Sequence, residues 1–131
     1  MAASWGYDNR MKGGIIMDAS QVAEYFLTLQ DEDAGDTISN LKLQKLVYYA
    51  QGYHLAMFNA PLFPDPIEAW THGPVVPDLY RKYRQYGASP IPRPETFDRS
   101  ALNGDTVDFL NEVYSVVGQF SAWKLRDMTH Q

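Results

Sequence analysis

Apolar residues recur at helical spacing in five stretches of this 131-residue chain. In the first stretch, Val22, Phe26 and Leu29 stand at i, i+4 and i+7, the spacing of one helix face. The longest stretch has an apolar stripe of its own, which runs from Leu43 through Tyr53 to Met57. The predicted helices cover residues 19–31, 40–58, 77–86, 105–117 and a last segment that begins at Ser121.

Polar and glycine residues mark where these helices begin and end. Asp18, with Gln21 three residues later, has the pattern of a capping box at the first helix. Ser39 or Asn40 is expected to cap the second helix. Gly35 is expected in the left-handed conformation after the first helix, where glycine carries no steric penalty.

Prolines separate the second helix from the third. Three of them lie between residues 61 and 66, and they exclude a helix there. Residues 67–71 then alternate between apolar and polar side chains, which predicts a short strand that ends at His72-Gly73-Pro74. Alternating prolines over 88–103 predict an extended loop, with an edge strand around Ile91 as an alternative.

The expected fold is therefore mainly α: a single compact helical domain of about five helices with a small β-strand or hairpin element around residues 66–72. Residues 17–131 form this domain. Residues 1–16 contain three glycines and no periodicity, so we interpret them as a disordered or tag-like N-terminal tail.

Composition excludes several classes of site. The chain has no cysteine, and no two of His54, His72 and His130 have the spacing of a metal pair on one helix. No phosphate-binding loop, dinucleotide fingerprint or nucleophile elbow is present. We therefore expect no metal and no cofactor. No stretch is apolar enough to span a membrane, and the absence of cysteine fits a cytoplasmic protein.

Charge and aromatic residues point to protein contacts. The net charge of −5 makes nucleic acid an unlikely partner, although residues 39–86 carry five basic and three acidic side chains. Between residues 80 and 84, tyrosines alternate with basic residues, a combination common at protein interfaces and in single-stranded nucleic-acid sites. Tyrosines that line the core are the alternative. Lys42, Lys45 and Gln51 fall outside the apolar stripe and are expected to be exposed.

Three sequence blocks carry a resemblance to a known family. Residues 38–52 read ISNLKLQKLVYYAQG. The second block covers residues 61–80, which begin with PLF and read IEAWTHGPVVPDLY from residue 67, and residues 125–130 match more weakly. In order and spacing they resemble the Panacea domain, also called SocA-like, of bacterial and phage-associated antitoxins. Family members usually continue past the Thr-His pair, whereas this chain stops at Gln131, so it is either a naturally short member or truncated at its C-terminus.

The resemblance implies a non-enzymatic antitoxin of a type II toxin–antitoxin system, encoded by a bacterium or a prophage, that neutralises a cognate protein toxin by direct binding. Three alternatives remain: an adaptor that delivers the toxin to a ClpXP-type protease, a DNA-binding autoregulator, and an enzyme that uses the loop at His72. Within the matching blocks, Trp70, His72, Gly73 and Pro74 are expected to be structural. The candidate partner-binding residues are Lys42, Gln44, Lys45, Tyr49, Tyr80, Arg81, Tyr83 and Arg84.

Overall fold

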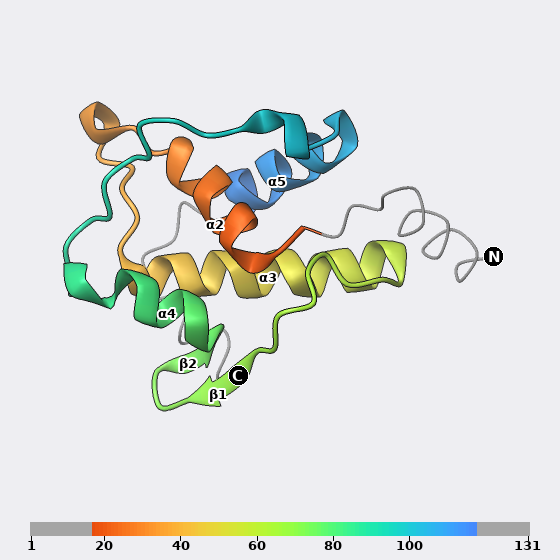
Figure 1. Ribbon diagram of the computed structural model, residues 1–131, viewed down its shortest axis with the longest axis horizontal. Helices are drawn as coiled ribbons and strands as arrows, with labels where there is room; N and C mark the ends of the chain where they lie inside the picture. The colour runs from red at the N-terminus through yellow and green to blue at the C-terminus, as the bar shows by residue number, and fades with distance from the viewer. Residues whose placement is uncertain (1–16, 118–131) are drawn as a thin grey trace.

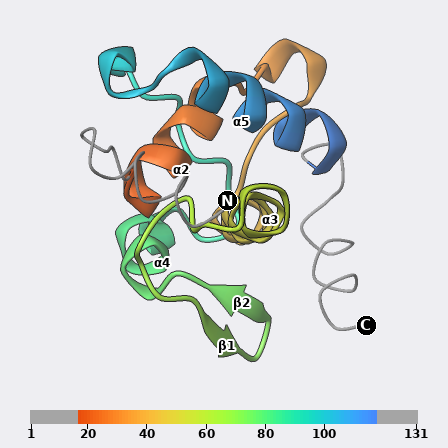
Figure 2. The ribbon, with the colours of Figure 1, turned by 90° about the vertical axis from the view of Figure 1, so that its right-hand side faces the viewer.

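A computed structural model describes residues 17–117 of the chain. One long helix, α3 (Asn40–Phe58), lies at the centre of these residues. Helices α2 (Ala19–Thr28) and α5 (Gly104–Val117) pack on one side of α3, while α4 (Pro77–Tyr83) and a β-hairpin pack on the other (Figures 1 and 2). This arrangement confirms a mainly helical fold with a small antiparallel sheet.

Helix α2 begins as predicted and ends earlier. The Asp18 carboxylate accepts from the Gln21 amide at 2.8 Å, and the Gln21 side chain accepts from the Asp18 amide at 2.9 Å, which completes the capping box. The helix ends at Thr28 instead of residue 31. The chain then forms an isolated bridge between Asp31 and Asp36, which enclose the 3-10 turn η1 (Glu32–Ala34). Gly35 has φ 74°, the left-handed conformation that we predicted.

Helix α3 has both predicted ends. The Ser39 hydroxyl accepts from the Lys42 amide at its N-terminus, and Asn59 adopts a left-handed conformation at its C-terminus. Its first half is buried around Leu43 and Leu46. The apolar stripe is not buried along the whole helix, because Tyr53 is 40% and Met57 64% exposed. The C-terminal turns of α3 extend beyond the core.

The hairpin pairs β1 (Glu68–Trp70) with β2 (Gly73–Val75) in antiparallel register. The first strand was predicted, but residues 73 and 74 were expected to break the structure and instead form the second strand. Gly73 follows the two-residue turn with φ 114°, and Pro74 is tolerated because a two-stranded sheet has two open edges.

The remaining predicted elements are largely confirmed. Pro77 occupies the first turn of α4, whose last residues tighten into the 3-10 turn η2 (Arg84–Tyr86). The region of Ile91 forms no strand, although its amide donates to the Ile38 carbonyl at 2.8 Å. A 3-10 turn, η3 (Arg99–Ala101), precedes α5. The predicted tail over 1–16 and the helix from Ser121 lie outside the described residues.

Candidate functional site

The first turns of α3 hold the hairpin in place. The Lys45 side chain is fully buried, and its Nζ donates to the His72 carbonyl oxygen at 2.7 Å. His72 lies in the turn between β1 and β2, so this bond ties the tip of the hairpin to the central helix. The prediction that Lys45 is exposed is therefore wrong, because α4 and the hairpin cover the face of α3 that carries it.

A buried amide side chain connects α3 to the start of α4. The Gln44 Oε1 accepts from the Val76 amide at 3.0 Å, and its Nε2 donates to Asn40 Oδ1 at 3.0 Å. Asn40 in turn donates to the Tyr80 carbonyl at 3.1 Å. Gln44 is fully buried, so the expectation that it forms an exposed contact is wrong. These bonds fix the orientation of the hairpin and α4 relative to α3.

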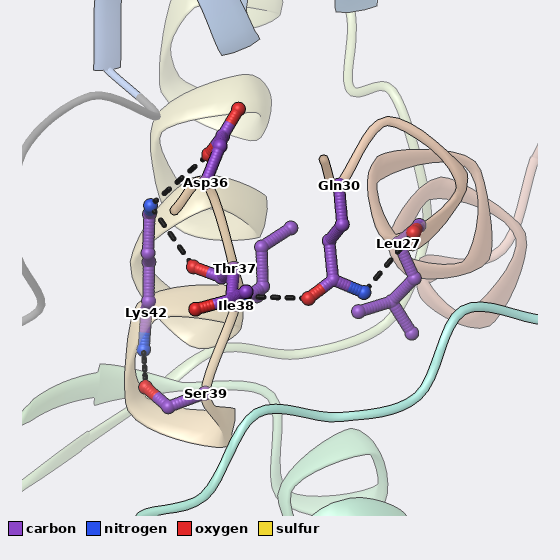
Figure 3. Close-up of polar contacts among 7 residues, drawn as sticks. All are labelled: Leu27, Gln30, Asp36, Thr37, Ile38, Ser39 and Lys42. Atoms are coloured by element: carbon purple, nitrogen blue, oxygen red, sulfur yellow. Dashed lines mark hydrogen bonds and ion pairs between the residues drawn. The ribbon is translucent and has the colours of Figure 1, made fainter. Parts of the chain in front are cut away.

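Lys42 stabilises the turn that precedes α3 (Figure 3). Its Nζ donates to the Thr37 carbonyl at 3.2 Å and lies 3.7 Å from the Asp36 carboxylate. Burial lowers the pKa of Lys42 from its ordinary value, and the charge of Asp36 opposes that shift. The prediction that Lys42 is exposed is wrong, because its side chain folds back against the turn that precedes α3.

Two glutamines hold further loops by accepting and donating backbone hydrogen bonds. Gln30 accepts from the Ile38 amide at 2.7 Å and donates to the Leu27 carbonyl at 3.1 Å (Figure 3). Gln51 accepts from the Leu62 amide at 2.7 Å and donates to the Phe63 carbonyl at 2.8 Å. Gln51 is only 9% exposed, which corrects the prediction that it lies on the surface. Both side chains satisfy buried backbone groups that no regular element pairs.

A groove of about 780 Å³ opens between the start of α3, the hairpin and the α4–η2 segment. The rings of Trp70 and Tyr80 meet edge to face in it, with centroids 5.1 Å apart. The indole Nε1 of Trp70 donates to Glu68 Oε1 at 3.0 Å. His72 and the exposed Arg84 also line the groove. Arg84 forms no ion pair with any residue between 17 and 117.

Neither a metal site nor a membrane-spanning helix occurs in the described part of the chain. Within residues 17–117, no group of three histidine or acidic side chains could hold a metal ion. His54 lies apart from His72 and bonds through Nδ1 to the Ala60 carbonyl at 2.6 Å, and burial lowers its pKa. None of the helices in the described part is long and apolar enough to cross a membrane.

Comparison with known proteins shows the family of this chain. Residues 43–131 match the model of the family described as Antitoxin SocA-like, Panacea domain. The chain belongs to this family. It is 33% identical over 104 aligned residues to Antitoxin SocA of Caulobacter vibrioides (strain NA1000 / CB15N). That alignment covers 71% of this chain and 55% of the relative, so the chain spans about half the length of this curated protein. No solved structure matches the chain.

The Panacea domain brings together only some of the candidate partner-binding residues. Tyr80 and Arg84 share the groove with Trp70 and His72. Arg81 is exposed outside the groove and pairs with Asp78 at 3.1 Å. Tyr49 lies beside Tyr48 on α3. The remaining four candidates are buried: Lys42, Gln44, Lys45 and Tyr83.

Sequence reasoning missed several groove residues of this Panacea domain. Leu41, Ala69, Gly87 and Ala88 line the groove without polar chemistry of their own. Ala69, Gly87 and Ala88 are small, which leaves the aromatic pair partly exposed. The hairpin could have been predicted from the spacing of Trp70 and Gly73, because two strands separated by two residues form a tight turn. The contact between the hairpin and α3 has no local sequence signal.

Proposed function

We propose that this chain is the antitoxin of a type II toxin–antitoxin pair, and that it neutralises a protein toxin in the bacterial cytoplasm by binding it directly. Membership of the Antitoxin SocA-like family supports an antitoxin role. The similarity to Antitoxin SocA points the same way, although it covers only part of that protein. The toxin, rather than a small substrate, is the proposed ligand of the groove.

The observation that carries this proposal is the composition of the groove. Tryptophan, tyrosine and arginine are the residues most enriched among interface hot spots. Here Trp70 and Tyr80 pack against each other, and Arg84 stands beside them without an ion pair inside the described chain. An acidic side chain of the toxin would pair with Arg84, while an apolar side chain would cover the two rings.

The buried polar contacts of α3 explain how the groove is kept in shape. Lys45 fixes the hairpin tip and Gln44 fixes the start of α4, so both walls are attached to the same helix. A surface that is rigid before binding loses less conformational entropy when the partner docks. The bound chain would then keep the toxin inactive by covering its active site or substrate entry, with no covalent chemistry by this chain.

The proposal can be tested by growth rescue with a steric block in the groove. The gene next to the one that encodes this chain is expressed as the candidate toxin, together with the wild-type protein, the Ala88→Arg variant or the Ala56→Arg variant. Ala88 lines the groove and is exposed, whereas Ala56 is exposed on α3 outside it, so each arginine is tolerated by the fold and only one fills the groove. We expect Ala56→Arg to restore growth and Ala88→Arg to fail.

Three results would contradict direct neutralisation through this groove. Equal rescue by both variants would place the contact elsewhere. Rescue that requires a ClpXP-type protease, together with loss of the toxin from cells, would assign an adaptor role. Rescue without a complex, accompanied by repression of the chain's own promoter, would assign autoregulation. Both variants should first be shown to accumulate as folded protein, by circular dichroism.

A further inference from the structure

A second cleft lies between the C-terminal half of α3 and α5. It has a volume of about 630 Å³ and is separate from the hairpin groove, with which it shares no lining residue. Its floor is apolar and aromatic, and it is formed by Tyr53, Met57, Phe58, Phe109, Val113 and Val116.

The floor of this cleft leaves large apolar side chains in contact with solvent. Met57 is 64%, Val116 50% and Tyr53 40% exposed. Deeper in the cleft the rings of Phe58 and Phe109 meet edge to face, with centroids 5.9 Å apart. Single exposed apolar residues are ordinary, but a contiguous apolar patch with a polar border marks a binding surface. This is also where the apolar stripe of α3 extends beyond the core.

The border of the cleft carries negative charge only. Asp105, Asp108 and Glu112 line it, and all three are exposed. They stand at i, i+3 and i+7 on α5, so they follow one face of the helix over about 10 Å. None of them forms an ion pair or hydrogen bond with a side chain of residues 17–117. The cleft therefore combines an apolar floor with unpaired carboxylates in a row.

We propose that this cleft binds an amphipathic helix of a protein partner, whose apolar face carries lysine or arginine along its border. A helix fits because the cleft lies between two helices, and a third helix can pack its side chains into such a groove. Basic residues one and two turns apart on the partner would meet the three carboxylates in register. The inference does not depend on the toxin proposal, which concerns the other groove.

A model peptide tests this inference on the full chain. The probe is a fluorescently labelled amphipathic peptide of leucine and lysine, and its two controls replace every lysine with glutamine or with glutamate. Binding is followed by fluorescence anisotropy at low and high salt. We expect the lysine peptide to bind more tightly than the glutamine peptide, the glutamate peptide to bind weakest, and added salt to remove these differences because it screens surface charges.

Paired variants locate the binding site. Met57→Lys puts a cation into the cleft and should weaken binding of the lysine peptide at least about tenfold, as loss of a central apolar contact does at other interfaces. Leu55→Lys is the control, because Leu55 is 46% exposed on the same helix but does not line the cleft. Asp108→Asn with Glu112→Gln should weaken binding at low salt only. The matching control is Glu32→Gln with Asp33→Asn, an exposed acidic pair in η1.

Several outcomes would overturn the inference. Equal affinity for the lysine and glutamate peptides would show that the carboxylates select nothing. Equal effects of Met57→Lys and Leu55→Lys would place the peptide elsewhere. Tighter peptide binding after Trp123→Ala and Leu125→Ala would show that the chain's own C-terminal segment occupies the cleft. Self-association that Met57→Lys abolishes would assign the cleft to a second copy of this chain.

Discussion

The Nζ atom of Lys45 lies 2.7 Å from the carbonyl oxygen of His72, which is 27 residues further along the chain. The lysine belongs to the buried part of α3, and the carbonyl belongs to the turn of the hairpin. Through this contact, the central helix determines where the hairpin wall of the groove lies.

Replacing Lys45 should loosen the hairpin more than the rest of the domain. In Lys45→Met the side-chain volume is largely kept, but the bond to His72 is lost. We expect amide hydrogen exchange over residues 68–75 to become about tenfold faster, since local opening then costs less free energy. Lys82→Met is the control, because Lys82 is exposed and pairs with Glu24 at 3.4 Å. If Lys45→Met leaves exchange in the hairpin unchanged, this bond does not hold it.

Replacing Gln44 should lower the free energy of unfolding. Gln44→Ala leaves the buried amide of Val76 without an acceptor, and an unsatisfied buried donor costs about 1–3 kcal/mol. Urea denaturation measures this change. Gln85→Ala removes an exposed glutamine from η2 and should change the free energy by less than about 0.5 kcal/mol. Equal effects of the two substitutions would contradict the proposed link between α3 and α4.

The errors in the sequence-based interpretation have a common physical cause. An apolar stripe on one face predicts a helix that is buried on one side only. Helix α3 has neighbours on two sides, so Lys45 is buried outside the stripe beneath the distant hairpin turn, whereas Lys42 is covered by the turn that directly precedes the helix. Conversely, Tyr53 and Met57 continue the stripe but no described element covers them. Periodicity gives the position of a helix, but the number of its neighbours depends on tertiary packing.

The local signals were more informative. The capping box at Asp18, the serine cap at Ser39 and the left-handed Gly35 all depend on contacts within a few residues. The first and third were predicted correctly, and Ser39 was one of the two predicted caps. The hairpin was only half predicted, because Gly73-Pro74 resembles a break when its pairing with β1 is unknown. For the candidate site, the sequence identified Tyr80 and Arg84, whereas the groove that unites them with Trp70 depends on the fold.

Two tyrosines of the core should respond differently to loss of the hydroxyl group. The Tyr25 hydroxyl donates to Asn111 Oδ1 at 2.5 Å, so Tyr25→Phe should lower the free energy of unfolding by about 1 kcal/mol. The Tyr114 hydroxyl is buried and bonds to none of the described residues, and burial with the nearby Asp36 charge raises its pKa. Tyr114→Phe should therefore stabilise the domain or leave it unchanged. A marked loss of stability on thermal unfolding would show that the hydroxyl bonds to Asp36.

His54 should make the domain less stable in mild acid. Burial lowers the pKa of His54 below its ordinary value of 6.5, so near that pH the unfolded chain binds the proton more tightly than the folded one. Its contribution to stability is complete above pH 6.5 and is lost as the pH falls through the lower, folded-state pKa. His54→Gln should flatten the pH dependence of urea unfolding in that window. His72→Gln is the control, since the His72 side chain is exposed; an equal change would contradict the role of His54.

The central claim is that the groove beside the hairpin binds a protein toxin, and a direct affinity measurement tests it best. Isothermal titration of the purified toxin encoded beside this chain would compare wild type, Arg84→Glu and Arg81→Glu. Both arginines lie in the α4–η2 segment and are exposed, but only Arg84 lines the groove. We predict that Arg84→Glu weakens binding at least about tenfold, while Arg81→Glu stays within about threefold of wild type. Equal affinity for all three proteins would contradict the account.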